Sequence, residues 1–326
     1  MTTRILPLLA CGLLAACGNQ PLATDADGKY SVTGRCEPTQ LAQALTEHAE
    51  ATLVVDFGPG TSDFAKTIKS SKRATPPYAI TVGPQPRDGD EIPDAVIVLD
   101  HGAKAAVDLA LLACNGVPLQ PNRIEIGTRT VTAANRNAGG NPRVAPGDVM
   151  LAMMKLQHQK LLTTNPATDE VHFIGWLPCD PKASWQTTLK NGITAAAARY
   201  PQLQVLTQAD ELPATEQAEQ LIKKGCRVLL IATSDVEESK AIQAIAATGP
   251  DGGVKVIVLD PTVNGEHGAC VIGCSTETIG LAAAALVKEL LPEGGSLLTC
   301  FGNAADQQVR GFCDAMGFAA TRLLSR

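Results

Sequence analysis

The chain has 326 residues and a formal net charge of −6, and 45% of its residues are hydrophobic while 18% are charged. This length exceeds that of a usual single domain and predicts two, and the composition is typical of a globular chain with a large core. The negative charge and the lack of a basic run argue against nucleic acid or an anionic membrane surface as a partner.

The N-terminal residues have the pattern of an export signal. Arg4 precedes an apolar segment, residues 5–16, which is too short to remain in a bilayer as a spanning helix. The segment ends in Leu14-Ala15-Ala16-Cys17, which resembles the bacterial lipoprotein signal. The resemblance implies that residues 1–16 are removed, that Cys17 is acylated, and that residues 17–29 form a tether. The alternative is an ordinary signal peptide with an incidental cysteine.

The first half of the chain alternates predicted strands and helices, identified by β-branched runs and by helical spacing of apolar residues. In chain order these are a strand at 30–32, a helix at 39–50, a strand at 52–57, a helix at 62–71, strands at 78–82 and 95–99, a helix at 103–115, extended segments at 123–126 and 128–132, a loop at 134–143 and a helix at 148–162. Gly116 is the expected stop of the helix before it. The methionines of the last helix, Met150, Met153 and Met154, are expected to form packing surface rather than a cofactor site.

The second half repeats the alternation more clearly. In chain order its predicted elements are a strand at 171–177, a helix at 184–200, a strand at 203–206, a helix at 215–224, a strand at 227–231, a helix at 235–247, a strand at 254–259 followed by a polar loop, a strand at 296–301 and a helix at 306–316. Such alternation predicts βαβ units on a parallel sheet with helices on both faces. Ligands of such sheets bind outside the carboxyl ends of the strands.

Four short segments of this half resemble the opening half of the ribose-type periplasmic binding proteins. They are Leu189-Lys190-Asn191-Gly192, Gln220-Leu221-Ile222-Lys223-Lys224-Gly225, Val256-Ile257-Val258-Leu259-Asp260 and Gly311-Phe312-Cys313-Asp314-Ala315. Each segment is weakly specific, and their order carries the resemblance. It implies two α/β lobes, each a mainly parallel sheet flanked by helices, joined by three hinge crossovers and closing over a small solute.

The first half resembles the closing half of the same family, so the two halves stand in reversed order. Residues 37–56, 95–116 and 122–135 carry this part of the resemblance. We infer a circular permutation in which residues 134–170 join the family-type ends and the new ends open before Lys29, in a surface loop where permutation is tolerated. The alternative is two unrelated α/β domains in sequence.

The permutation predicts how the chain is divided between the lobes. The expected division is one lobe from residues 30–94, 118–146 and 293–326, another from 95–117 and 171–292, and a linker helix at 147–170.

The expected ligand site lies at the strand ends, with Asp260 as its main residue. A carboxylate directly after the strand at 254–259 can accept hydrogen bonds from two sugar hydroxyls, although it can also cap a turn. The resemblance implies that an aromatic ring near Trp185 stacks on a sugar ring, although Trp185 can instead be a core residue at a helix start. It also places Asp235 at the ligand, although Ser234 and Glu237 form a pattern expected to cap that helix.

Further candidates also follow predicted strands or replace family residues. Asp180, Asp56 and Asp100 follow strands, and Gln308 stands where the family usually has an arginine. An Asp100–His101 catalytic pair is disfavoured because adjacent residues on an extended chain point to opposite sides. The glycine-rich residues 57–62 lack the lysine of a P-loop, so no nucleotide cofactor is expected.

Beyond Cys17 the chain has eight cysteines, most of them within apolar runs. They are Cys36, Cys114, Cys179, Cys226, Cys270, Cys274, Cys300 and Cys313. We expect buried thiols, with one disulfide possible in an exported chain. The cysteines form no C-x-x-C pair and the histidines are dispersed, so no metal site is predicted.

Together these features predict a lipid-anchored, extracytoplasmic and monomeric solute-binding protein for a sugar or similar small polar molecule, which it delivers to an ABC-type transporter. No enzymatic activity and no cofactor are expected. Hydrophobic Ala232 and Leu99 stand where the family has polar residues, so the ligand is expected to be less polar than ribose or weakly bound. One alternative is a sensory or interaction lipoprotein with little ligand binding. An exported enzyme based on Asp100, His101 and Asp260 is a third.

Overall fold

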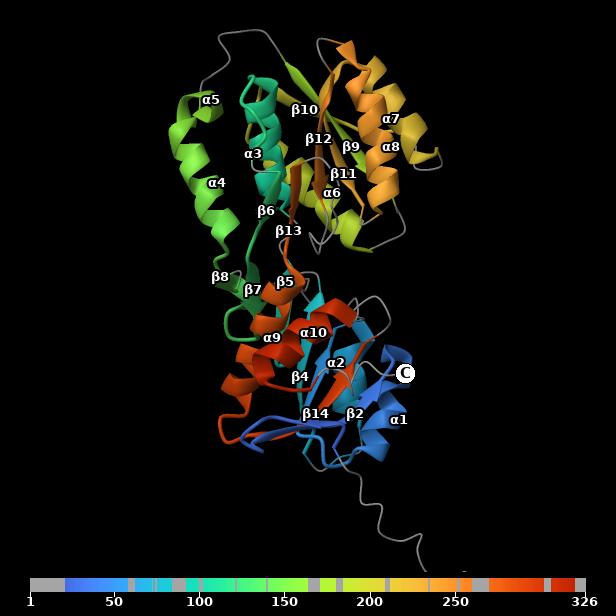
Figure 1. The fold of residues 1–326 in the computed structure, drawn as a ribbon, viewed down its shortest axis with the longest axis vertical. Helices are drawn as coiled ribbons and strands as arrows, with labels where there is room; N and C mark the ends of the chain where they lie inside the picture. Colours follow the sequence, from blue (N-terminus) through green and yellow to red (C-terminus); the bar gives the residue numbers. More distant parts are fainter. Residues whose placement is uncertain are drawn as a thin grey trace, which may run out of the picture.

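The computed structural model describes residues 21–57, 62–71, 73, 75–83, 92–99, 102–120, 122–138, 140–163, 171–179, 184–208, 212–233, 235–250, 253–259, 270–301 and 306–319. The described chain forms a mixed α/β fold of two lobes, each built on one sheet that is mainly or entirely parallel (Figure 1). This two-lobed α/β architecture agrees with the fold class predicted from the sequence. No helix within these ranges is long and apolar enough to cross a membrane.

The first lobe, lobe A, contains an eight-stranded sheet. In spatial order its strands are β1 (Ala23–Thr24), β2 (Tyr30–Cys36), β14 (Gly295–Cys300), β3 (Leu53–Asp56), β4 (Tyr78–Gly83), β5 (Ala95–Leu99), β7 (Thr128–Val131) and β8 (Asn141–Arg143). The five neighbouring strands β2, β14, β3, β4 and β5 run parallel to one another. The other pairs of this sheet, β1 with β2, β5 with β7 and β7 with β8, are antiparallel.

Helices cover both faces of the lobe A sheet. One face packs against α1 (Leu41–Glu47), which follows a 3-10 turn at Pro38–Gln40, and against α2 (Ser62–Ser70). The other face packs against α9 (Thr276–Leu290) and α10 (Asp306–Met316).

The second lobe, lobe B, contains a six-stranded sheet that is parallel throughout. In spatial order its strands are β10 (Leu203–Leu206), β9 (His172–Pro178), β11 (Cys226–Ala232), β12 (Lys255–Leu259), β13 (Cys270–Gly273) and β6 (Arg123–Glu125). The run Val228-Leu229-Leu230-Ile231 in β11 is fully buried, as expected for a parallel strand covered on both faces.

Six helices of the described chain pack around the lobe B sheet. Its faces are covered by α3 (Ala103–Cys114) with α6 (Ser184–Ala197) and by α7 (Ala214–Lys223) with α8 (Val236–Ala247). Helix α4 (Pro146–Gln157) packs beside β6, and α5 (Gln159–Thr163) packs on α3.

The chain passes between the lobes four times, and the crossovers lie together. They run from β5 to α3, from β6 to β7, from β8 to α4 and from β13 to α9 (Figure 1). The amide of Ile126 donates to the carbonyl of Gly273 at 2.8 Å, and that of Gly127 donates to Asp148 Oδ2 at 2.9 Å. At Gly102, an added Cβ would lie 2.4 Å from Cγ2 of Ile272. Hydrogen bonds and close packing therefore hold the crossovers side by side.

Several expected boundaries are corrected by the sheet pairing. Strand β5 lies in lobe A, because it pairs with β4, and β6 lies in lobe B, because it pairs with β13. Helix α9 packs against α10 and the lobe A sheet rather than continuing lobe B, and α4 belongs to lobe B rather than to a separate linker. The alternative of two domains in sequence is wrong, because the lobe A sheet combines strands from both ends of the chain.

Other local predictions also need correction. The single helix expected at 148–162 is two helices, α4 and α5, and the expected loop at 134–143 contains the short strand β8. Met150 and Met154 pack against the core, but Met153 is 68% exposed, so the methionines form packing surface only in part. Strand β13 and helix α9 were not predicted.

Candidate functional site

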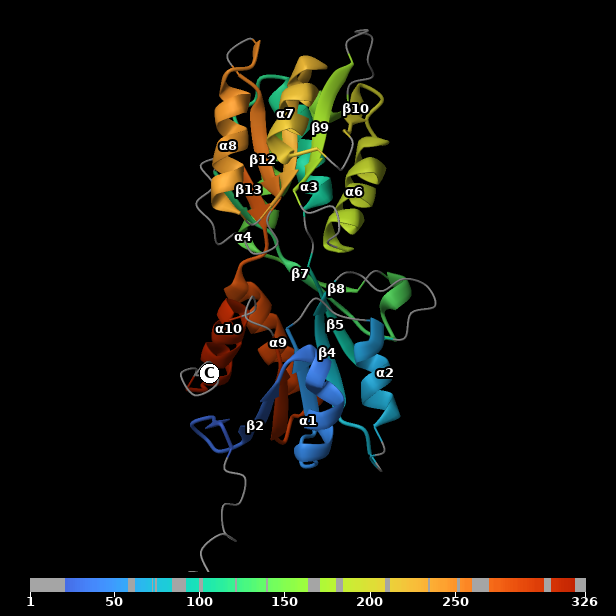
Figure 2. The ribbon, with the colours of Figure 1, turned by 90° about the vertical axis from the view of Figure 1, so that its right-hand side faces the viewer.

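The carboxyl ends of the parallel strands in the two sheets face each other across the crossovers. Strands β13 and β6 of lobe B, and β5 of lobe A, each end where the chain passes into the other lobe (Figure 2). Because the neighbouring strands are parallel, their carboxyl ends lie on the same side of each sheet. We call these two sides the facing edges. Open α/β sheets bind ligands at such edges.

The facing edge of lobe A carries a row of side chains in register. Cys36, Cys300, Asp56 and Thr81 occupy matched positions on β2, β14, β3 and β4. Asp56 is 2% exposed, and Thr81 Oγ1 donates a hydrogen bond to its Oδ2 at 3.3 Å. The structure therefore places Asp56 at the predicted edge, where its carboxylate is held inside the lobe.

Aromatic residues directly follow two members of this row in the chain, Phe57 after Asp56 and Phe301 after Cys300. Phe57 packs against Phe312 of α10 with their ring centroids 5.4 Å apart, and Phe301 is fully buried. The Arg35 guanidinium lies over the Phe301 ring, 4.5 Å from its centroid. Such stacking holds a cation near the edge. Sequence analysis did not select Arg35, although its place one residue before the end of β2 was a signal.

Gln308 lies in the first half of α10 and is half-buried. Its Oε1 is buried and has no hydrogen-bond partner within the described part of the chain. A buried carbonyl oxygen without a partner is costly, because water has been removed from it. This oxygen is thus an acceptor that a ligand donor could satisfy.

Polar groups at the facing edge of lobe B bind to the protein itself. Gln186 Nε2 donates to the carbonyl of Ala232 at 3.0 Å, and Thr233 Oγ1 donates to Glu238 Oε2 at 3.1 Å. Burial raises the pKa of the Cys179 thiol, and the neighbouring Glu238 raises it further, so the thiol stays protonated. These contacts fix the start of α8 and the end of β9.

Asp235 caps α8. Its Oδ1 accepts hydrogen bonds from the amides of Glu237 at 2.8 Å and Glu238 at 3.1 Å. The cap is therefore Asp235 rather than Ser234, which lies outside the described residues. The exposed Asp235 carboxylate is used by the helix, which weakens its expected role as a ligand contact.

Several residues named from the sequence lie outside what the structure describes. Asp260, Asp180 and Asp100 lie outside the described residues, as does His101. Trp185 belongs to α6, but its side chain is outside what the structure describes. Residues 1–20, which include Cys17, are outside it as well.

A hydroxyl–carboxylate cluster joins the lobes at the crossovers. Ser275 Oγ donates to Glu125 Oε1 at 2.5 Å, and Thr278 Oγ1 contacts the same oxygen. Ser275 Oγ also accepts from the amide of Thr278 at 3.0 Å and thereby caps α9. Glu125 ends β6 in lobe B, whereas α9 belongs to lobe A. This cluster, which sequence analysis missed, is part of the hinge.

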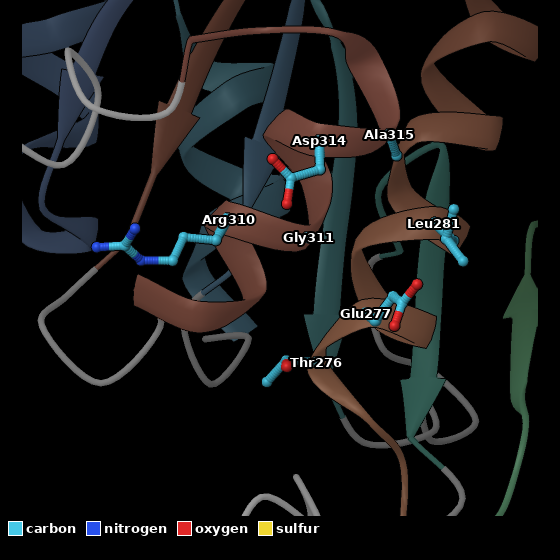
Figure 3. A pocket seen from close by; sticks show the side chains of 7 residues that line it. All are labelled: Thr276, Glu277, Leu281, Arg310, Gly311, Asp314 and Ala315. Carbon is cyan, nitrogen blue, oxygen red and sulfur yellow. The ribbon is translucent and has the colours of Figure 1, made fainter.

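A groove of about 610 Å³ lies between α9 and α10 (Figure 3). Its lining residues are Thr276, Glu277, Leu281, Arg310, Gly311, Asp314 and Ala315. The groove belongs to the helical surface of lobe A and is separate from the row of residues at its facing edge. Among the described residues there is no group of three or more side chains that could hold a metal ion.

Comparison with known proteins supports the architecture. Residues 174–321 match the family model of a periplasmic binding protein domain. The matched segment starts in β9 and ends after α10, so it spans most of lobe B and the β14–α10 unit of lobe A. No curated protein matches the chain.

Proposed function

We propose that this protein is an extracytoplasmic binding protein for a sugar or similar small polar solute, which it holds between the facing edges of its lobes. The observation that carries the proposal is that the carboxyl ends of the parallel strands in two sheets face each other across a shared set of crossovers (Figure 2). The match of residues 174–321 to a periplasmic binding protein domain supports it. Closure of the lobes around the solute is a hinge motion, and the protein acts by binding rather than catalysis.

We place the solute near Asp260, Asp180, Trp185 and Asp100, with Gln308 of α10 on the lobe A side. Asp260 follows β12 directly and is the carboxylate proposed to accept solute hydroxyl groups. The unpaired Oε1 of Gln308 favours a ligand that donates a hydrogen bond.

The test is a thermal-shift panel of sugars and related solutes with small-angle scattering. A solute at a hundred times its Kd should stabilise the protein by about 2.7 kcal/mol and make it more compact. Asp260→Ala should lose both responses, whereas Asp314→Ala, a change on the exposed surface of α10, should keep them. No response to any solute would contradict the proposal.

The proposal includes a lipid anchor at Cys17 and delivery of the solute to an ABC-type transporter in the same membrane. The lipoprotein-like Leu14-Ala15-Ala16-Cys17 supports it. Multiple acyl chains anchor a protein stably, where one does not. Metabolic labelling with palmitate should mark the wild-type chain but not Cys17→Ser, and equal labelling of both would rule out this anchor.

We further propose that the chain is a circular permutant. The order β10-β9-β11-β12-β13 in lobe B corresponds strand by strand to β2-β14-β3-β4-β5 in lobe A. Strands β9 to β13 follow one another along the chain. Their counterparts in lobe A are divided, because β14 and α10 come last in the chain whereas β2 to β5 come first. The described ends, near Asp25 and Gly317, line one groove. A variant that starts at residue 171 and links residue 319 to residue 22 should therefore fold with a similar Tm. Failure of this variant to fold would argue against permutation.

A sensory or interaction lipoprotein is the second candidate. It is favoured by the internally satisfied polar groups at the lobe B edge, where Gln186, Thr233 and Asp235 already bind the protein. Recovery of a membrane partner by cross-linking, without any solute response, would favour this function over transport.

A further inference from the structure

Two cysteines from opposite ends of the chain meet in lobe A. Cys36 ends β2 and Cys300 ends β14, and the parallel register places them directly opposite each other. Their Sγ atoms are 2.8 Å apart. Cys36 is 5% exposed and Cys300 is fully buried, within the core between the sheet and α1 and α2.

A β-bulge creates this pairing. Leu297 pairs with Val32 but Leu298 pairs with Gly34, so Thr33 is an extra residue in β2. Without the bulge the register would place Arg35, not Cys36, opposite Cys300. A bulge of this kind redirects the side chains that follow it.

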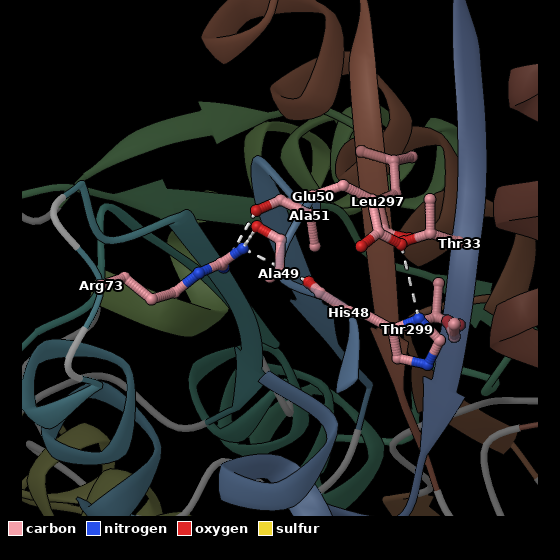
Figure 4. Close-up of polar contacts among 9 residues, drawn as sticks. Thr33, His48, Ala49, Glu50, Ala51, Arg73, Leu297 and Thr299 are labelled. Carbon is pink, nitrogen blue, oxygen red and sulfur yellow. Dashed lines mark hydrogen bonds and ion pairs between the residues drawn. The ribbon is translucent and has the colours of Figure 1, made fainter. Parts of the chain in front are cut away.

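Side-chain contacts hold the bulge in place. Thr33 Oγ1 donates to the carbonyl of Leu297 and Thr299 Oγ1 to that of Gly34, each at 3.3 Å. Figure 4 shows Thr33, Leu297 and Thr299 together with His48. The His48 ring lies over Gly34, where an added Cβ would be 2.3 Å from Nε2. The register that brings the two sulfurs together is therefore built into the packing.

The backbone geometry suits a disulfide. Neighbouring strands lie about 4.8 Å apart, which falls within the Cα separations of roughly 4.4–6.8 Å found in disulfides. The two side chains already point to the same face, since their sulfur atoms are in contact. A small rotation of the side chains would bring the sulfurs to the bond length of about 2.0 Å without a change of register.

We propose that Cys36 and Cys300 form a disulfide that closes lobe A covalently. The oxidant is a small-molecule or protein disulfide, RSSR. One cysteine thiolate attacks RSSR and releases RS⁻, and the second thiolate then displaces the other RS⁻ from the mixed disulfide. Each cysteine sulfur loses one electron, and the two protons and two electrons leave as two RSH.

The folded environment indicates when the bond forms. Hydrogen bonding to Cys36, together with burial, raises the pKa of the Cys300 thiol, and a protonated thiol is a poor nucleophile. Exchange therefore occurs as the strands pair, before α1 covers them. The finished bond is then shielded from reductants. It joins residues separated by 264 positions, a long loop whose closure restricts the unfolded chain.

Mass spectrometry can test the bond directly. The full chain is refolded from denaturant in oxidised and reduced glutathione, alkylated under denaturing conditions and digested with trypsin without reduction. Cleavage gives residues 36–66 and 289–310, each with a single cysteine. A linked pair of these peptides, separated by reductant, is the expected result. Recovery of both as singly alkylated peptides, or linked to other cysteines, would overturn the proposal.

Thermal stability, measured without added solute, gives a second readout that does not depend on the proposed function. Reduction should lower the Tm of the wild type by roughly 5–10 °C. The variants Cys36→Ala and Cys300→Ala should show no such response. Cys226→Ala, a change at another buried cysteine, should keep it. An equal response to reductant in all four proteins would contradict a Cys36–Cys300 bond.

Discussion

The Tyr200 hydroxyl donates a hydrogen bond to Oδ1 of Asp108 at 2.6 Å, and this contact ties the segment that follows α6 to the middle of α3. Asp108 is only 2% exposed. Arg199 Nη2 lies 3.5 Å from its Oδ1, and Lys155 of α4 pairs with its Oδ2. A single buried carboxylate therefore connects α3, α4 and the segment that follows α6 in lobe B.

Asp108→Ala should lower the free energy of unfolding by roughly 1.5–3 kcal/mol, because it removes the charged acceptor of the Tyr200 hydroxyl. Denaturant unfolding measures the loss. Glu219→Ala is the control, since its partner Lys223 is 75% exposed, and it should cost about 0.5 kcal/mol or less. Equal losses in the two variants would show that Asp108 is not a stabilising centre.

Tyr200 should make the protein sensitive to alkaline pH. Burial, and then the hydrogen bond to Asp108, raises the pKa of the Tyr200 hydroxyl from 10.0 to about 12. Below pH 10 the hydroxyl is protonated in both states. Between pH 10 and 12 the unfolded chain loses this proton while the folded chain keeps it, so stability falls as the pH rises.

Thermal unfolding across this range checks the pH dependence. Tyr200→Phe should flatten the fall in Tm relative to the wild type. Tyr78→Phe changes a tyrosine that is 45% exposed and should leave the fall unchanged. A wild-type slope in Tyr200→Phe would mean that other groups cause the alkaline loss.

The hinge cluster should depend on the charge of Glu125. Glu125→Gln removes the charged acceptor of Ser275 and Thr278 and should lower stability by about 1.5–3 kcal/mol. Urea unfolding gives the value. Glu277→Gln, an exposed change in the first turn of α9, should have little effect. The same small effect in both variants would remove Glu125 from the hinge.

Contact between α9 and α10 should require glycine at position 280. A Cβ on Gly280 would lie 2.3 Å from both the carbonyl carbon of Gly311 and the amide nitrogen of Phe312. Because these are backbone atoms, Gly280→Ala must push the helices apart, at a cost of about 1–3 kcal/mol. Leu281→Ala, at a side chain that is 47% exposed, should cost less. The Tm values of the two variants test this, and an equal fall in Tm in both would contradict the need for glycine at position 280.

Local patterns in the sequence established most of the secondary structure. Apolar runs such as Val228-Leu229-Leu230-Ile231 predicted buried parallel strands, because a strand covered on both faces has no polar side. The alternation of strands and helices predicted the α/β class and the strand ends as the site. Asp108, in the apolar segment Ala106-Val107-Asp108-Leu109-Ala110, was also a readable signal of a buried polar contact.

Lobe membership was decided by strand pairing, which leaves no local signal. Strands β5, β6 and β13 stand next to short crossovers, and a run of three to five residues does not specify its partner strand. Likewise, Asp235 could be read as a cap or as a ligand contact until its hydrogen bonds to Glu237 and Glu238 were known.

By itself the sequence determined the alternation of strands and helices and so the α/β class, because burial and periodicity act over a few residues. Only the tertiary structure decided that β2 and β14 are neighbours, with Cys36 opposite Cys300. That relation depends on a one-residue bulge and on contacts between segments 264 residues apart. Long-range register is fixed by packing, which no local pattern contains.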